Sequence, residues 1–397
     1  MGDGGVGTAL RFRDFRYIWF ADLASIAGDQ LARVALAVLV YGRTRSALAA
    51  TVTYALTFLP ALLGGVLLSW VADRFRRREV MVVTDLLRAV LVAAMAIPGL
   101  SLLVVCGLLV IVVLLGSPFT AARSALLPDV LPGDHYERGL ALVQITGQSA
   151  QLAGFAGGGL LVAALSPPVA LLGNAGTFLL SAALVRFGVA DRPAPAATAD
   201  RREGGTVAVL GAIAGDRRRR ALVLLAWLVG WYVVPESLAA PYADQLGAGP
   251  AAVGVLMAAD PLGSVLGAWL FTRFVPAPVR GRLVGVLAVG AGLPLVACVF
   301  RPDLPVTLVL WGLSGMLATA YLVQTQAEFV RATVETERGR AVGVAAAGII
   351  AAQGLAVLAG GLLAEWTDPA TAIAIAGSAG VLLCGAVAVA WHRATTA

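Results

Sequence analysis

Apolar stretches of about 20 residues recur along the whole chain, and short polar or arginine-rich segments separate them. Each stretch is long enough to cross a hydrocarbon core about 30 Å thick as an α-helix. Only helices and closed barrels satisfy their backbone groups in lipid, and the sequence lacks the alternating pattern of barrel strands. The 397 residues are 59% hydrophobic and 13% charged, whereas soluble domains are about 25% charged. We therefore predict an all-α integral membrane protein.

The apolar pattern predicts about twelve transmembrane helices. They cover residues 17–42, 47–71, 80–98, 101–122, 138–164, 168–188, 221–245, 251–272, 281–300, 304–327, 340–364 and 369–391. The longest segment outside them, 189–220, begins with the Pro/Ala-rich run Pro193–Ala197 and ends in Arg217–Arg220. Proline does not continue a helix, and like charges stay solvated, so a non-helical linker is expected here. The predicted domains are two six-helix bundles at 1–190 and 221–397, joined by a cytoplasmic linker at 191–220.

The arginines predict the orientation of the helices. All 29 basic residues are arginine, and nearly all fall in alternate loops. The positive-inside rule then explains the net charge of +6 without nucleic-acid binding. We expect a multi-pass protein of the bacterial inner membrane with both termini cytoplasmic. No cleavable signal peptide is evident, so the first helix is expected to be retained.

An internal repeat supports a duplicated six-helix unit. Three segments of the first half recur in order in the second half, each displaced by close to half the chain length. The matches pair Ser69–Phe75 with Ala268–Phe274, Glu137–Gly139 with Glu337–Gly339, and Gly158–Leu161 with Gly360–Leu363. Repeats of this kind are common among transporters.

The first predicted helix carries three ionisable residues on one face. Asp22, Asp29 and Arg33 are spaced i, i+7 and i+11, so they fall within about 40° of one another around the helix. Charged groups inside a membrane are costly, and this stripe must face protein or water. Either Arg33 neutralises Asp29 as an i,i+4 pair, or Asp22 or Asp29 binds a proton or a cationic group of a substrate.

Other polar residues of the predicted helices are candidates for proton coupling or for a substrate cavity. Glu236 and Asp260, in the seventh and eighth helices, are secondary proton-site candidates. One face of the tenth helix is suited to lining a cavity and carries Ser314, Ala318, Tyr321, Thr325 and Glu328. Glu328 lies near the predicted cytoplasmic end, which favours a gate or loop pair. Gln144 and Gln148 share a face of the fifth helix and could bond a ligand or only neighbouring helices.

The remaining residue types argue against an enzyme. The two histidines, His135 and His392, lie in predicted cytoplasmic segments, so carboxylates must carry any proton coupling. The sequence holds no Walker loop, metal cluster or nucleophile triad, and we expect neither ATP hydrolysis nor a cofactor. The three cysteines fall within apolar spans and are expected to be packing residues.

The loop after the second helix, Asp73–Arg78, resembles the signature of the major facilitator superfamily. Ser69 and Arg76 stand where two glycines of that signature would be. The resemblance extends over essentially the whole chain and implies the major facilitator fold, with a cytoplasmic gate formed by this loop. The gate residues it implies are Asp73, Arg74, Arg77 and Arg78, with which we group Asp85, Arg88 and Arg123. Asp85 and Arg88 are expected near the cytoplasmic surface, paired with the gate loop.

Other motifs are similar to the branch of that family with macrolide-efflux proteins and the enterobactin exporter. They are Phe12–Arg16, Gly28-Asp29, Asp85 with Arg88, and Ala122–Asp129. The run Gly154, Gly157, Gly158 and Gly159 resembles an exporter motif in which Phe155 replaces a proline. These glycines could equally form a tight helix contact, because small residues let backbones approach in lipid.

The resemblance implies a proton-coupled exporter, an antiporter that moves amphipathic drugs, antibiotics or siderophores by alternating access. Its partners would be the small-molecule substrate, protons and the bilayer, and we expect a monomer. An importer or lipid flippase on the same fold is the first alternative. A non-transporting membrane sensor that signals through the linker is the second.

Overall fold

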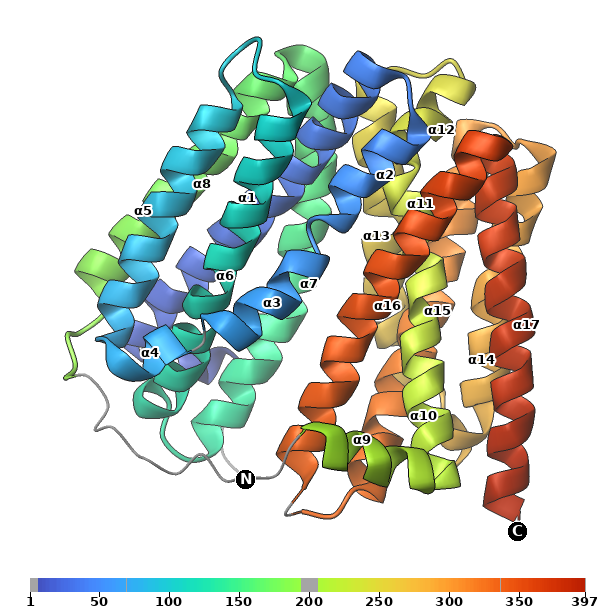
Figure 1. The fold of residues 1–397 in the computed structure, drawn as a ribbon. Helices are drawn as coiled ribbons and strands as arrows, with labels where there is room; N and C mark the ends of the chain where they lie inside the picture. Colours follow the sequence, from blue (N-terminus) through green and yellow to red (C-terminus); the bar gives the residue numbers. More distant parts are fainter. Residues whose placement is uncertain (1–5, 69, 194–205, 336, 397) are drawn as a thin grey trace. The chain divides into compact units, whose positions relative to one another are not determined.

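The computed structural model describes residues 6–68, 70–193, 206–335 and 337–396, and the regular elements of these segments are all helices (Figure 1). The elements before residue 194 are η1 (Val6–Arg11), α1 (Arg13–Thr44), α2 (Ala47–Ala55), α3 (Leu59–Leu67), α4 (Trp70–Arg74), α5 (Arg77–Met95), α6 (Leu102–Val130), α7 (Asp134–Ala164) and α8 (Pro167–Gly188). Those after residue 205 are α9 (Thr206–Gly215), α10 (Arg217–Leu228), η2 (Val229–Val233), α11 (Val234–Ser237), α12 (Ala239–Gln245), α13 (Pro250–Phe274), α14 (Ala277–Val296), η3 (Ala297–Phe300), α15 (Leu304–Ala332), α16 (Arg338–Trp366) and α17 (Pro369–Thr396).

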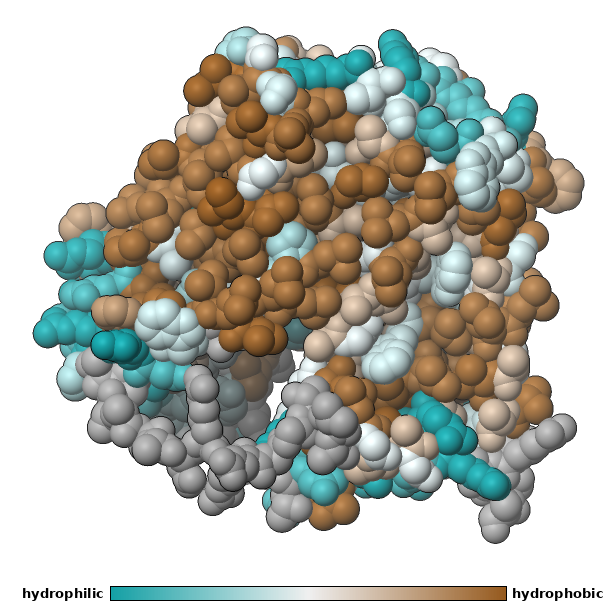
Figure 2. All heavy atoms as spheres, viewed as in Figure 1, coloured by the Kyte–Doolittle hydropathy of each residue, from teal (hydrophilic) through white to brown (hydrophobic). Residues whose placement is uncertain are grey.

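The surface of the helices is that of a membrane protein. Within the described residues, ten helical segments are long and apolar enough to cross a bilayer. The long helices outside this set are α5, which carries five charged residues, and α7, which carries three glutamines. Large apolar side chains stand out from the helices, including Leu103 at 84% exposure and Leu382 at 73%. On the face shown in Figure 2, apolar residues cover the helix flanks and hydrophilic residues gather at the ends.

Two of the predicted spans are not continuous helices. The second, 47–71, is divided into α2, α3 and α4, and the seventh, 221–245, is divided into α10, η2, α11 and α12. Pro60 and Pro235 lie at the second residue of α3 and α11, respectively, where proline is tolerated because first-turn N–H groups need no helical partner. The start of α3 and the start of α11 therefore follow from proline, which the apolar pattern does not reveal. Glu236 lies in α11, directly after Pro235.

The prediction of a non-helical linker holds for residues 189–193 but is wrong for most of 206–220. Residues 206–215 form α9, which lies across the ends of the long helices of its unit in Figure 1. Arg217–Arg220 form the first turn of α10, because the Asp216 carboxylate caps that helix by accepting from the N–H of Arg218 and Arg219. Burial alone would raise the pKa of Asp216, but these hydrogen bonds outweigh it and lower the pKa. Residues 194–205 of the linker, with most of the Pro/Ala-rich run, lie outside the described residues.

The chain forms two compact units. The first contains Met1–Leu39 and Leu59–Asp200, and the second contains Val40–Phe58 and Arg201–Ala397. The grouping differs from the predicted bundles in one segment, 40–58, which belongs to the second unit. There α2 packs on α16 so closely that a Cβ at Gly361 would overlap Thr51. The predicted bundle boundaries stay a prediction.

Candidate functional site

Asp22 is held inside the first unit by an arginine from another helix. Its residue surface is 4% exposed, and the Arg123 guanidinium from α6 binds its carboxylate. A buried charge without a partner is strongly destabilising, so this pair neutralises Asp22 within α1. The sequence analysis grouped Arg123 with the gate loop, and the structure instead places it on Asp22. The helix α6 continues through Arg123 to Val130, beyond the predicted end at residue 122.

A second ionic group joins α1 to α5. The Nη2 atom of Arg88 lies 3.1 Å from Oδ2 of Asp29, and its Nη1 atom lies 3.4 Å from Oδ1 of Asp85. The Phe178 ring covers the guanidinium, with its centroid 3.9 Å from Cζ. Two carboxylates thus share one guanidinium, which gives the group a formal charge of −1. The side chain of Asp29 is 37% exposed, whereas that of Asp85 is fully buried.

These contacts correct one prediction and add a partner to another. Asp85 and Arg88 were expected near the surface, in contact with the gate loop, but they lie buried in the middle of α5. Arg88 binds Asp29 from another helix, and the predicted pairing of Asp29 with the half-buried Arg33, one turn further along α1, stays a prediction. Helical spacing identifies neighbours on one helix, but it does not show which residue of another helix approaches.

The four residues of the predicted gate loop divide into two pairs. Arg77 forms an ion pair with Asp129 and donates to the carbonyl of Ala125, both on α6. Arg78 lies 3.4 Å from the carboxylate of Asp191. Asp73 and Arg74, at the end of α4, are exposed. Ser69, which precedes them in the signature, lies outside the described residues.

The glycines of α7 serve a close helix contact in this structure. A Cβ at Gly154 would overlap the backbone of Ala27 on α1, and one at Gly158 would press on Leu31. Gly157 faces open space, and Gly159 is buried. The packing interpretation therefore accounts for two of the four glycines.

The glutamines of α7 have a different setting. Gln144 is exposed and Gln148 is half-buried. Neither amide is hydrogen-bonded within the part of the chain that the structure describes. A role in ligand binding stays a prediction for both.

In the second unit, Glu236 is hydrogen-bonded to a tyrosine. The hydroxyl of Tyr54, on α2, donates to Oε2 of Glu236 on α11 at 2.5 Å. The residues are 4% and 5% exposed, respectively, so the bond lies in the interior. Tyr54 carries no sequence signal of this role, because 182 residues separate it from its partner.

Asp260 lies on α13 where that helix crosses α15. The hydroxyl of Ser264 interacts with its carboxylate, and Thr319 donates to Ser264 at 2.7 Å. A Cβ at Gly315 would overlap Asp260, so the close crossing depends on this glycine. The carboxyl groups of Asp260 and Glu236 are near enough to interact electrostatically. The structure thus brings together two acids that the sequence analysis named separately.

Most of the predicted cavity-lining face of α15 is covered by other helices of the second unit, although Thr325 lines a cavity that is described below. Ser314, Tyr321 and Thr325 are at most 1% exposed. The hydroxyl of Ser314 donates to the Ala291 carbonyl of α14, and that of Tyr321 to the Leu225 carbonyl of α10. A polar stripe on a helix can be covered by backbone carbonyls as well as by water, and here the carbonyls cover it.

Glu328 lies at the end of α15 that faces the arginine-rich start of α10. Its carboxylate lies 3.0 Å from guanidinium nitrogens of both Arg218 and Arg331. Gln324 donates to it at 3.2 Å. The contacts are those of an ion pair between helix ends rather than of a deep substrate site.

A set of hydrogen bonds fixes the turn between α1 and α2 on the second unit. Tyr41 and Arg45 each donate to the Asp244 carboxylate at 3.1 Å. Ser46 donates to Glu365 at 3.1 Å, near the end of α16. The sequence analysis did not identify Asp244 or Glu365, since each resembles an ordinary loop carboxylate.

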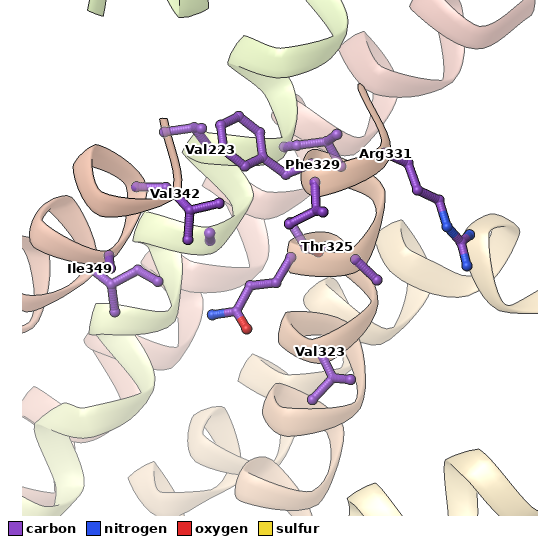
Figure 3. Close-up of a pocket in the computed structure, with 14 residues that line it drawn as sticks. Val223, Val323, Thr325, Phe329, Arg331, Val342 and Ile349 are labelled. Carbon is purple, nitrogen blue, oxygen red and sulfur yellow. The ribbon is translucent and has the colours of Figure 1, made fainter. Parts of the chain in front are cut away.

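The second unit also contains a cavity of about 540 Å³ between α10, α15 and α16. Figure 3 shows Val223, Val342 and Ile349 facing Val323, Thr325 and Phe329 across it. Among the described residues, no cluster of three metal-binding side chains is present. The second unit therefore contains two carboxyl groups within its helices, those of Glu236 and Asp260, and an apolar cavity.

Several known proteins are similar to this chain in sequence. A sequence model described as Major Facilitator Superfamily matches residues 18–273. The multidrug efflux pump Tap of Mycolicibacterium fortuitum is 28% identical over 397 residues, with 94% of each chain covered. The pump of the same name from Mycobacterium tuberculosis is 26% identical over 371 residues, covering 88% of this chain and 86% of that one.

Solved structures show the same fold at low identity. The nucleoside transporter NupG superposes with a TM-score of 0.78 at 14% identity, covering 95% of this chain and all of that one (100%). The peptide transporter POT in complex with sulfate gives a TM-score of 0.73 at 14% identity, covering 96% of this chain and 95% of the other. With its helical architecture, its apolar surface and the match over residues 18–273, this chain belongs to the Major Facilitator Superfamily.

Proposed function

We propose that this transporter is a proton-coupled exporter of amphipathic small molecules. The observation that carries the proposal is the set of carboxyl groups within the helices of both units, Asp29 with Asp85 in the first and Glu236 with Asp260 in the second. Intramembrane acids of this kind mark proton or substrate pathways in transporters. The outward direction is supported by the relatives, which are named multidrug efflux pumps.

In the first unit, the shared arginine can respond to a proton. While Asp29 is ionised, Arg88 divides its hydrogen bonds between Asp29 and Asp85. Protonation of Asp29 would cancel the formal charge of −1 and leave Arg88 to Asp85. The exposed share of the Asp29 side chain gives a proton access to it, whereas Asp85 is enclosed. A proton would thereby loosen the tie between α1 and α5.

In the second unit, the carboxyl groups of Glu236 and Asp260 can share one proton. Two neighbouring carboxylates in an apolar surrounding repel each other, and one bound proton removes that repulsion. When Glu236 is ionised it accepts a hydrogen bond from Tyr54, and release or uptake of its proton changes the strength of that bond. Since Tyr54 belongs to α2, the proton state of Glu236 would act on the α2–α11 contact.

Transport by everted vesicles tests the proposal. A pH gradient, acid inside, should drive accumulation of ethidium and Nile red by vesicles that contain the wild-type protein. Asp29→Asn and Glu236→Gln should each lower the gradient-driven rate at least about tenfold, which corresponds to 1.4 kcal/mol of coupling. Asp303→Asn is the matched control, because Asn keeps the cap that Asp303 provides for α15.

The alternatives give different results in the same assay. Accumulation only by right-side-out vesicles would mean import, and transfer of labelled lipid without dye transport would mean a flippase. Unchanged dye transport by both acid variants would overturn the coupling role. If deletion of residues 197–215 abolished function while the protein stayed folded, a sensor would be favoured over a transporter.

The same proposal includes the orientation of the chain. The arginine distribution and the bacterial relatives support an inner-membrane protein with cytoplasmic termini. Reporter fusions at both termini should be active only for reporters that function in the cytoplasm. Activity at either terminus of a reporter that functions only outside the cytoplasm would contradict this orientation.

A further inference from the structure

We infer that the cavity between α10, α15 and α16 binds an uncharged amphipathic molecule, whose apolar body fills the cavity and whose one polar group bonds to Gln326. The inference rests on the proposed export function and names one class of cargo that this cavity would take. It concerns a site that lies wholly within the second unit.

The size and walls of the cavity suit a small organic molecule. Its volume of about 540 Å³ falls within the range of about 300–1,000 Å³ that is typical of ligand pockets. Apolar side chains from the three helices form most of the lining, among them Val223, Phe329 and Ile349 (Figure 3). Ala226 and Ala346 also line it, and their small side chains leave the space open. Burial of apolar surface is therefore the main source of affinity.

The polar groups of the lining explain why the ligand should carry no charge. The hydroxyl of Thr325 already donates to the Tyr321 carbonyl, and the Arg331 guanidinium is bound to Glu328. In Figure 3 the Arg331 side chain extends away from the other labelled residues. Gln326 is exposed, and among the described residues its amide makes no hydrogen bond. An amide can both donate and accept, so it fits a carbonyl, hydroxyl or amine of the ligand.

A second apolar groove continues along the same seam between α10 and α16. It has a volume of about 500 Å³ and is lined by Trp227, Trp231 and Ala359, among others. The indole of Trp227 donates to the carbonyl of Ala345, which lines the first cavity, at 3.1 Å. The groove therefore offers a matched apolar surface in which a substitution can be made without entering the cavity.

The test is the saturable binding of Nile red to the purified full-length protein in detergent, without any gradient. Nile red is an uncharged dye with an apolar ring system and a carbonyl acceptor. Gln326→Leu should raise its Kd about three- to tenfold, the effect of one lost hydrogen bond. Ala346→Phe fills the cavity and should abolish saturable binding, whereas Ala359→Phe in the second groove should leave Kd unchanged.

Each outcome has a distinct meaning. If Ala346→Phe and Ala359→Phe lower binding equally, or if neither does, the cavity is not the site. If the charged dye ethidium binds the cavity as tightly as Nile red, the charge argument is wrong. Size-exclusion profiles and thermal midpoints that match the wild type show that a variant is folded. If wild-type vesicles transport neither dye but the purified protein binds Nile red in this cavity, the proposed export function is overturned and the proposed binding site is supported.

Discussion

The two units hold their buried acids in different ways. In the first, the carboxylates of Asp22, Asp29 and Asp85 are bound by the guanidinium groups of Arg123 and Arg88. In the second, the hydrogen bond shown to Glu236 comes from the Tyr54 hydroxyl, and the Ser264 hydroxyl lies beside Asp260. The repeat in the sequence would have suggested similar interiors. The chemistry of the interior thus differs between the two units.

The difference has an energetic meaning. A buried ion pair requires both charges, because loss of one partner leaves the other charged in an apolar medium. A carboxyl bound by a hydroxyl can exist in either protonation state, since the hydroxyl can donate or accept. We therefore expect the first unit to be the more sensitive to loss of a partner, and the second to be the more tolerant of a proton.

The largest effect is expected at the centre of the first unit. Arg88→Leu removes the cation that Asp29 and Asp85 share and should lower the free energy of unfolding by about 3–5 kcal/mol. Thermal or denaturant unfolding in detergent micelles measures it. The double variant Asp85→Leu with Arg88→Leu should recover part of the loss, because it also removes the fully buried carboxylate. No recovery would mean that packing against Phe178, rather than charge, dominates.

A smaller effect is expected for the hydroxyl bond in the second unit. Tyr54→Phe should cost about 0.5–1.5 kcal/mol while Glu236 holds a proton, because the bond then joins neutral groups. If Glu236 ionises as the pH rises, the cost should increase to about 1.5–3 kcal/mol, because the bond then involves a charged acceptor. Unfolding midpoints of variant and wild type across a pH series measure it.

The matched control for Tyr54 is Tyr242, a buried tyrosine of the same unit. Its hydroxyl lies 3.1 Å from that of Thr307, and neither partner of this bond is a carboxyl group. Tyr242→Phe should therefore cost the same free energy at neutral and at alkaline pH. If Tyr54→Phe cost as much as Arg88→Leu at neutral pH, the distinction between the units would fail.

The fold was predictable from sequence because the length of an apolar run and the need to satisfy backbone groups in lipid leave few choices. The positions of Asp22 and Asp29 inside the bundle were predictable for the same reason. Their partners were not, since Arg88 and Arg123 lie on other helices. Tyr321 shows most clearly what the sequence could not predict. Periodicity identified a polar face, but only the packed structure shows that protein rather than water covers it.

Two features were missed because the signal was local or weak. The helix α9 is ten residues long, too short for a membrane span, and part of the linker before it lies outside the described residues. The breaks at α2–α3 and α10–α12 fall inside apolar runs. Hydropathy reports the polarity of side chains and therefore does not show where a helix is interrupted. Pro235 marks the first turn of a new helix, and this signal would have placed Glu236 in α11.

The smallest effect is expected for an ion pair at an exposed helix end. Burial alone would raise the pKa of Asp368, but hydrogen bonds from Thr371 and Gln245 and the charge of Arg301 lower it to about 2. Because this folded-state pKa lies below the ordinary value of 3.8, the carboxylate stabilises the fold above about pH 4. That contribution is lost as the pH falls toward 2.

Solvent screening keeps the contribution to about 1 kcal/mol, since the side chain of Arg301 is 62% exposed and that of Asp368 is 24% exposed. Asp368→Asn should accordingly lower the unfolding midpoint slightly at pH 7 and not at pH 2. In a double-mutant cycle, Arg301→Gln and Asp368→Asn should couple by about 0.2–1 kcal/mol. The coupling energy between Arg301 and Asp368 should therefore be smaller than the loss of unfolding free energy in Arg88→Leu. If the two were equal, burial within the bundle would not explain the importance of Arg88.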